Sequence, residues 1–292
     1  MINSLSEVFE KQSINVDSGY TNQKNFFNEN GYCVIEKSSL PVTEFADIIN
    51  LLIEKEGWRG GWEGKEEYMK CQKNFQPGAY RLGNLFNKHE LFFEIITNEQ
   101  ILNVLSSILG DDIKIGALDM REPKKGTGQQ DLHMDWIPKR ESDDTENIVI
   151  MIFLDDSDEN NGHLRVVPKT HKMKGWIEEN IDDKTKHKDE IFLDVKKSSV
   201  VFMDANLWHS GTTNKTGRRR RVLFMDVRRR DIPQLLNQRI YLDETVQKKL
   251  TDVQKYLLGL RDNDSVFDER VFTAGNVYRK EFKTDGFVKM DK

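Results

Sequence analysis

The sequence predicts an α+β domain with a mainly β core of the sandwich or barrel type. In the first part of the chain, apolar residues recur at the spacing of amphipathic helices. From about residue 113 onward, the pattern changes to short apolar runs separated by turn-forming residues, which is typical of strands. Helical spacing returns near residue 244. The expected order is therefore helices, then a β core, then a further helix.

Length and composition favour a single globular domain. A chain of 292 residues is long enough to bury a full hydrophobic core. Its content of 37% hydrophobic and 32% charged residues is ordinary for a globular protein and excludes the disordered and fibrous classes. We expect one domain over residues 1–292, with a core at about 23–230 and a C-terminal helical extension at about 244–260.

Charge and cysteine content restrict the partners and the compartment. The net charge of −5 provides no basic field for nucleic acid. Cys33 and Cys71 lie in unrelated segments and do not form a disulfide framework, so free thiols and a cytoplasmic location are expected. The first 15 residues are polar, and no apolar run approaches the roughly 18 residues of a membrane helix. We therefore expect neither an export signal nor a membrane segment.

Helices are expected where a stripe of apolar residues is flanked by cap residues. Gly31 and Gly110 are suited to C-caps, and Thr43 and Asn98 to N-caps. The expected helices cover residues 23–30, 44–56, 99–109 and 244–260. Residues 57–74 show no sustained period, so we expect a long loop there.

Strands are expected in seven short apolar runs, the first of which follows Gly31 directly. These runs are Tyr32–Ile35, Ile113–Met120, Ile148–Leu154, Leu164–Val167, Ile191–Val195, Val200–Met203 and Val222–Val227. Several short strands with turn-rich connections indicate a sandwich or barrel.

A candidate metal site begins with a histidine and an aspartate two residues apart. In an extended segment, His133 and Asp135 point to the same face. Two histidines and one carboxylate form a site that leaves open positions on iron(II). His209 is the best candidate for the second histidine because it follows an apolar strand that can fold back against the first pair. His163 and His171 are weaker alternatives.

Three motifs that occur in order resemble the phytanoyl-CoA dioxygenase family. They are His133-Met134-Asp135, the run from Asn161 to Lys172 that contains Gly162-His163-Leu164 and Pro168, and His209-Ser210-Gly211. The segment Asn30–Ile35 resembles the opening strand of the family, and the resemblance covers roughly residues 23–230. It implies a double-stranded β-helix, also called a jelly-roll or cupin-like fold, with flanking helices.

The resemblance also implies the chemistry. The family pattern assigns the iron(II) ligands to His133, Asp135 and His209, with 2-oxoglutarate and O2 as co-substrates. The expected reaction is hydroxylation of an unactivated C–H bond in a small-molecule metabolite, with release of succinate and CO2. Because a carboxylate stands at position 135, hydroxylation-type chemistry is favoured over the halogenation of relatives that carry a small residue there.

The resemblance further suggests residues for the co-substrate and the substrate. The usual offset of eleven residues beyond the distal histidine falls on Arg220, whose guanidinium suits the far carboxylate of 2-oxoglutarate. Arg218 shares its strand face and is the fallback. Gln130 is expected to contact the co-substrate, and Trp136 and Arg81 the substrate.

The sequence is also compatible with other functions. The same hydrogen abstraction can lead to desaturation, cyclisation or epimerisation. A non-catalytic β-barrel that binds a small ligand would keep the three side chains as a relic, and two histidines with an aspartate can also hold the zinc of a hydrolase. Neither the primary substrate nor the oligomeric state follows from the sequence.

Overall fold

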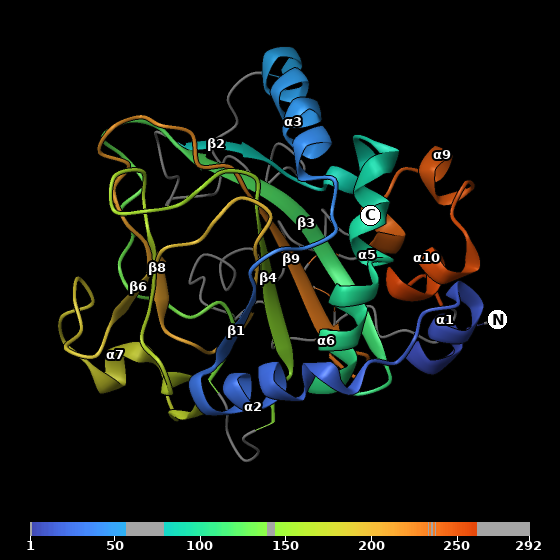
Figure 1. The fold of residues 1–292 in the computed structure, drawn as a ribbon, viewed down its shortest axis with the longest axis horizontal. Helices are drawn as coiled ribbons and strands as arrows, with labels where there is room; N and C mark the ends of the chain where they lie inside the picture. Colours follow the sequence, from blue (N-terminus) through green and yellow to red (C-terminus); the bar gives the residue numbers. More distant parts are fainter. Residues whose placement is uncertain are drawn as a thin grey trace, which may run out of the picture.

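Two antiparallel sheets form the core of the protein (Figure 1). The computed structural model describes residues 2–56, 79–138, 144–232, 234, 236 and 238–261. The loop expected at 57–74 and the segment after residue 261 lie outside these residues. The antiparallel strands and flanking helices are consistent with the predicted jelly-roll class.

The larger sheet has six strands among the described residues. Their order across the sheet is β1 (Tyr32–Ile35), β7 (Val200–Asp204), β4 (Asn147–Phe153), β9 (Val222–Arg229), β3 (Ile113–Pro123) and β2 (Ala79–Leu82). The smaller sheet has the order β6 (Ile191–Leu193), β5 (Leu164–Val166) and β8 (His209–Gly211). All seven predicted strands are confirmed, with ends that differ by up to three residues. The strands β2 and β8 were not predicted from the sequence.

The central strand β4 is buried on both faces, which explains its almost uninterrupted apolar sequence. In β4, Ile148, Ile150 and Ile152 pack in the cluster that the helices cover. The alternating residues Val149 and Met151 belong to a second cluster, which includes residues of both sheets. Successive side chains of a strand point to opposite faces. The second cluster therefore marks the space between the sheets.

Most of the helices cover the face of the larger sheet that points away from the smaller sheet (Figure 1). Their bounds are α1 (Leu5–Gln12), α2 (Thr21–Asn30), α3 (Val42–Glu56), α5 (Phe93–Ile96), α6 (Glu99–Leu109), α7 (Ile177–Asn180), α8 (Gln238–Tyr241), α9 (Glu244–Gln247) and α10 (Asp252–Leu257). Single 3-10 turns occur at Ser18–Tyr20, Leu85–Asn87, Glu90–Phe92 and Thr170–Lys172. None of the helices that the structure describes is long and apolar enough to cross a membrane.

Three of the four predicted caps are present, at Gly31, Asn98 and Gly110, whereas Thr43 is not an N-cap because α3 already begins at Val42. The Asn98 side chain accepts a hydrogen bond from the backbone N–H of Ile101 at 3.2 Å and begins α6. Gly31 ends α2 with a φ of +84°, in the left-handed region that favours glycine. A Cβ atom at Gly31 would lie 2.5 Å from the His171 Nδ1 atom, so this close approach also requires glycine. His171 is thus a buried structural residue beside the α2 terminus.

The expected helix over residues 244–260 is wrong, because the structure divides it into α9 and α10. Thr251 interrupts it with a capping box: its hydroxyl accepts from the Gln254 N–H at 3.2 Å, and the Gln254 side chain accepts from the Thr251 N–H at 2.9 Å. The chain therefore starts a new helix at Asp252. This helix lies beside α1, where Lys11 and Asp252 form an ion pair at 3.1 Å.

Candidate active site

Three of the predicted site residues lie together next to the smaller sheet. The Nε2 atom of His133 lies 3.7 Å from Oδ1 of Asp135. The Nε2 atom of His209 lies 3.4 Å from Oδ2 of the same carboxylate. One ligand atom from each residue lies within 4.8 Å of the other two. This group is therefore a candidate metal site, with the nitrogen and oxygen donors that divalent transition metals bind.

Backbone pairing brings the two histidines together although they are far apart in the sequence. The His133 N–H donates to the His209 carbonyl at 3.0 Å, and the His209 N–H donates to the His133 carbonyl at 2.9 Å. This antiparallel bridge fixes the distance between the two imidazoles. The Asp135 N–H donates to the Ala205 carbonyl at 2.7 Å and holds the third residue of the group.

Hydrogen bonds orient both imidazole rings. His133 Nδ1 lies 2.8 Å from the Asp131 carbonyl oxygen, and His209 Nδ1 lies 3.0 Å from the Leu207 carbonyl oxygen. A carbonyl can only accept, so each Nδ1 carries the hydrogen when its ring is neutral. The Nε2 lone pairs therefore face Asp135, as in metal sites in which the second ring nitrogen donates to a carbonyl.

The surroundings of the two histidines shift their pKa values in opposite directions. Burial, together with the neighbouring His209, lowers the pKa of His133 to about 4, so this ring is neutral at pH 7. Burial also lowers the pKa of His209, but the charge of Asp135 and a hydrogen bond to it outweigh this effect and raise the pKa above its usual value. A metal ligand must be a neutral imidazole, so metal binding would release a proton held on His209.

The three residues line a pocket of about 220 Å³ between the two sheets. Its wall includes Val149 and Met151, which face the space between the sheets. The charged and amide side chains of the wall, besides the triad, are Arg81, Asp119, Arg121, Gln130, Arg220 and Asp226. A concave, partly apolar site with a few convergent polar groups is typical of a small-molecule binding site.

Arg220 lies in the pocket wall and Arg218 does not. Arg220 is 2% exposed, its Nε lies 3.5 Å from the Ser157 hydroxyl, and its guanidinium lies 5.8 Å from the centre of the Phe153 ring. Burial lowers its pKa to about 10, so it is still a cation at pH 7. The Arg218 side chain is half exposed and pairs with Asp158. Of the two predicted arginines, Arg220 therefore has the position that an anion in the pocket needs.

Of the other predicted contact residues, two line the pocket and one does not. Gln130 and Arg81 line the pocket. Trp136 does not: it is 1% exposed, its indole N–H donates to the Glu146 carboxylate at 3.0 Å, and the Arg228 guanidinium covers its ring at 4.2 Å. The structure thus gives no support to Trp136 as a substrate wall. Its large apolar ring is used in the core between the sheets.

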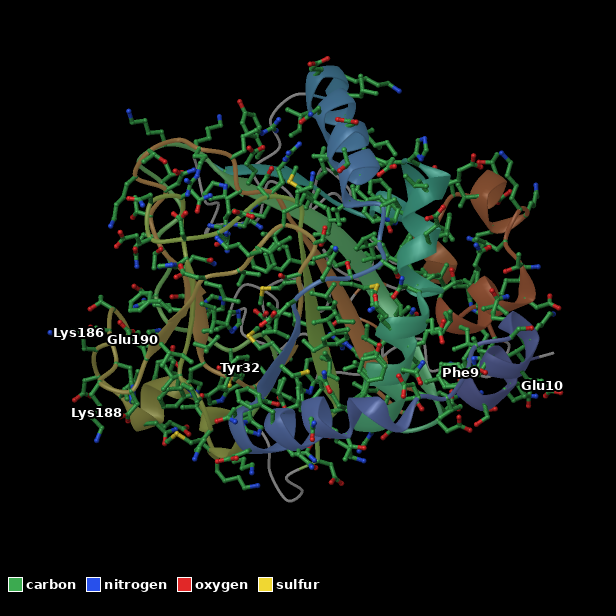
Figure 2. All side chains as sticks on the ribbon, in the orientation of Figure 1. Phe9, Glu10, Tyr32, Lys186, Lys188 and Glu190 are labelled. Carbon is green, nitrogen blue, oxygen red and sulfur yellow. The ribbon has the colours of Figure 1, made fainter. Side chains whose placement is uncertain are left out.

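Arg165, which was not predicted from the sequence, supports the site through hydrogen bonds to the segments that carry the two histidines. Its Nε donates to the hydroxyl of Ser210, next to His209, at 2.5 Å. Its NH2 nitrogen donates to the Gln130 carbonyl at 3.1 Å, three residues before His133. Its NH1 nitrogen pairs with Glu190 at 2.9 Å. One buried guanidinium therefore connects the two chain segments that carry the histidines with the loop that contains Glu190. Figure 2 labels Glu190 in this loop, together with Lys186 and Lys188.

Replacing Arg165 with methionine should lower the free energy of unfolding by about 3–5 kcal/mol, because it leaves Glu190 without its partner in a largely buried place. Urea denaturation of the metal-free protein measures this loss. Arg218→Met is the matched control, since it removes an exposed ion pair and should cost less than about 1 kcal/mol. Equal losses in the two variants would rule out the supporting role of Arg165.

Comparison with solved structures gives the same fold. The epimerase SnoN from nogalamycin biosynthesis has a TM-score of 0.59 at 13% identity, over 85% of this chain and 95% of that one. The carbocyclase SnoK from the same biosynthesis has a TM-score of 0.56 at 19% identity, over 79% and 90%. HygX from Streptomyces hygroscopicus, solved with nickel and 2-oxoglutarate, has a TM-score of 0.56 at 13% identity, over 72% and 86%.

Sequence comparison gives the family. A curated protein of Stutzerimonas stutzeri, described as a probable alpha-ketoglutarate-dependent hypophosphite dioxygenase, is 25% identical over 178 residues. The match spans 59% of this chain and 57% of that protein, so it covers little more than half of the relative. The family model of phytanoyl-CoA dioxygenase matches residues 27–222, which is more than half of the chain. The protein therefore belongs to the phytanoyl-CoA dioxygenase (PhyH) family.

Proposed function

We propose that the protein is an iron(II)- and 2-oxoglutarate-dependent dioxygenase that hydroxylates a C–H bond of a small-molecule metabolite. The observation that carries this proposal is the group of His133, Asp135 and His209 in a pocket that also contains Arg220. In the balanced reaction, the substrate, 2-oxoglutarate and O2 give the hydroxylated product, succinate and CO2. One oxygen atom enters the product and the other enters succinate.

The donor set fits iron(II). Two imidazoles and one carboxylate on one side of the ion leave positions on the other side for a chelating 2-oxo acid and for O2. Both Nε2 atoms are available as donors because each Nδ1 donates to a carbonyl. When bound, the ion and 2-oxoglutarate would supply the oxidising power, and the protein supplies binding and orientation.

In this proposal, Arg220 binds the far carboxylate of 2-oxoglutarate. A buried guanidinium can make two parallel hydrogen bonds to a carboxylate, and these are strong because both partners are charged. Gln130 lies close to the metal site: its Oε1 would be 3.2 Å from a Cβ atom at Gly211, two residues beyond His209. The Gln130 amide is thus suited to a polar contact with the co-substrate where it approaches the metal.

The similar proteins include enzymes with different reaction outcomes: an epimerase, a carbocyclase and a probable hypophosphite dioxygenase. The metal ligands do not select among these outcomes, because all of them need the same ion and co-substrate. We propose hydroxylation, with desaturation, cyclisation and epimerisation as the alternatives that product analysis must separate. The choice among them depends on how the pocket wall holds the substrate against the metal.

Anaerobic addition of iron(II) and 2-oxoglutarate should produce a weak visible absorption band from the chelated complex. Zinc(II) in place of iron(II) provides the control, since its filled d shell gives no such band. Removal of the metal by a chelator should abolish both the band and succinate release under air. A purely ligand-binding barrel would stay colourless at saturating iron(II) and 2-oxoglutarate, and that result would contradict the proposal.

A further inference from the structure

The residues that precede the three candidate ligands in the chain are buried away from the pocket. Successive side chains of an extended segment alternate between two sides. The candidate ligands line the pocket, whereas Leu132 and Met134, each one residue before a ligand, lie in a separate small apolar cluster. Trp208, the residue before His209, belongs to the same cluster. This cluster therefore packs against the ligand segments on the side that faces away from the pocket.

One segment, residues 176–190, covers this cluster. The cluster takes in the apolar residues at the start of the segment, which are Trp176, Ile177 and Ile181. Further along, the His187 ring stands edge-on to the Trp208 ring, with 5.9 Å between the ring centres. The Leu132 N–H donates to the Lys184 carbonyl at 2.8 Å. The segment thus contacts the residues that directly precede both histidines.

A buried ion pair fixes the C-terminal end of this segment. Arg165 is 3% exposed, and its guanidinium donates to the Thr185 carbonyl at 2.7 Å and pairs with the Glu190 carboxylate. The same carboxylate accepts from the His187 N–H at 3.1 Å. The guanidinium also donates to both segments that carry the histidines. Because a buried guanidinium needs a charged partner, Glu190 maintains this whole set of contacts.

We propose that residues 176–190 form a support segment that holds the two histidines at the spacing that the metal needs. In this proposal, Glu190 is a positioning residue that acts through Arg165. The inference rests on the proposed function, because it concerns how the same metal site is maintained. Ligands that are already arranged before the metal arrives bind it more tightly, since less conformational freedom is lost on binding.

The coupling between the support segment and the metal must act in both directions. If the docked segment raises the affinity for the metal by some factor, the metal must favour the docked segment by the same factor. No residue of the support segment lines the pocket or belongs to the candidate metal site. A change in this segment when the metal binds would therefore be transmitted through the apolar cluster and Arg165.

Zinc(II) binding to the metal-free protein tests the first direction. Calorimetry at constant pH gives the dissociation constant, and the pH is fixed because metal binding releases protons. Glu190→Ala should weaken zinc binding by at least about tenfold, the lower end of the range for residues that orient metal ligands. Glu190→Gln keeps an oxygen acceptor of the same length but loses the charge, so its dissociation constant should lie between those of Glu190→Ala and the wild type.

Two control variants separate positioning from other effects. Glu178→Gln removes an exposed ion pair with Lys184 in the same segment and should change the dissociation constant by less than about twofold. Leu257→Ala creates a cavity in the cluster under the helices, away from the pocket, so it should destabilise the protein but bind zinc as the wild type does. Zinc binding at wild-type affinity in Glu190→Ala, or equal weakening in Leu257→Ala, would overturn the proposal.

Hydrogen exchange of the wild-type protein, with and without zinc(II), tests the second direction. Backbone exchange in residues 176–190 should slow when zinc binds, because the metal favours the docked segment. Exchange in α6, which packs in the cluster under the helices, should not change. In Glu190→Ala, the slowing in residues 176–190 should be lost. If zinc leaves the exchange of this segment in the wild type unchanged, the proposal is wrong.

The outcomes also separate this inference from the proposed function. If the wild-type protein binds neither zinc(II) nor iron(II), the proposed function itself fails. If it binds the metal and forms the visible band with iron(II) and 2-oxoglutarate, but Glu190→Ala binds zinc equally well, only the role of the support segment fails.

Discussion

Replacing Asp135 with alanine is expected to abolish substrate oxidation while the fold stays intact. Substitution of residues that merely orient metal ligands costs about 10- to 100-fold, so the loss of a ligand should exceed about a hundredfold. The backbone N–H of residue 135 can still donate to the Ala205 carbonyl, and 38% of the Asp135 side chain is exposed, so little packing is lost. Succinate release and circular dichroism measure the two effects separately.

Added formate should restore part of the activity of Asp135→Ala, because a small carboxylate can enter the space of the missing side chain. Asp194→Ala is the matched control: it also breaks a histidine–aspartate pair, at 2.6 Å from His163, but outside the pocket. This control should keep wild-type activity. Wild-type turnover in Asp135→Ala without formate would show that Asp135 is not a metal ligand.

The strands were predictable where burial on both faces left a simple pattern. The strands β4 and β7 are apolar except for one terminal residue each, which fits strands that helices cover on one face and the second sheet covers on the other. The strand β9 was predicted from its apolar first half, although Asp226, Arg228 and Arg229 follow. The strand β8 is only three residues long and contains Ser210 and Gly211, so its pairing with β5 is decided by contacts distant in sequence. In β2, Arg81 interrupts a short segment, and the apolar pattern gives no signal.

Helix prediction failed at the two ends of the described chain for different reasons. The helix α1 has a readable signal, because Ser4 caps it and Leu5, Val8 and Phe9 form its buried face. The high polarity of the surrounding residues concealed this short stripe. At the other end, the spacing of apolar residues continues through Thr251, but the hydroxyl of Thr251 forms a better helix start than a helix interior.

The three candidate metal ligands could be predicted from the sequence. Two of them are close together in the chain, and the third belongs to a recognisable motif. His133 and Asp135 are two residues apart, and His209 belongs to a run that resembles the family motif. Arg165 could not be assigned in this way. Its role depends on contacts with three distant segments, at Ser210, Gln130 and Glu190, and such contacts leave no periodic signal in one sequence.

Burial of the Arg220 charge lowers the stability of the free protein, and binding of the proposed ligand would offset this loss. Among the described residues no carboxylate pairs with Arg220, and its Nε donates to the Ser157 hydroxyl at 3.5 Å. Burial lowers its pKa to about 10, which reflects the loss of hydration around the charge. Removing this charge should therefore leave the stability of the free protein unchanged or raise it, as is common at functional sites.

Arg220→Gln is expected to weaken 2-oxoglutarate binding by roughly 30-fold or more, since truncation of a buried, hydrogen-bonded charge pair costs about 2–5 kcal/mol. Iron(II) binding should be unaffected, because the metal ligands are unchanged. Arg220→Lys keeps the charge but cannot make two parallel hydrogen bonds to a carboxylate. Its affinity for 2-oxoglutarate should therefore lie between that of Arg220→Gln and that of the wild type.

Thermal unfolding in the presence and absence of 2-oxoglutarate, with zinc(II) in place of iron(II), measures both effects at once. A ligand that binds the folded state raises the melting temperature, and the rise grows with the logarithm of the ligand's affinity. The wild type should gain stability from 2-oxoglutarate, whereas Arg220→Gln should start at an equal or higher melting temperature and gain little. An unliganded variant that is much less stable than the wild type would mean that Arg220 supports the fold. Its burial beside Ser157 and Phe153 would then need a structural explanation in place of a functional one.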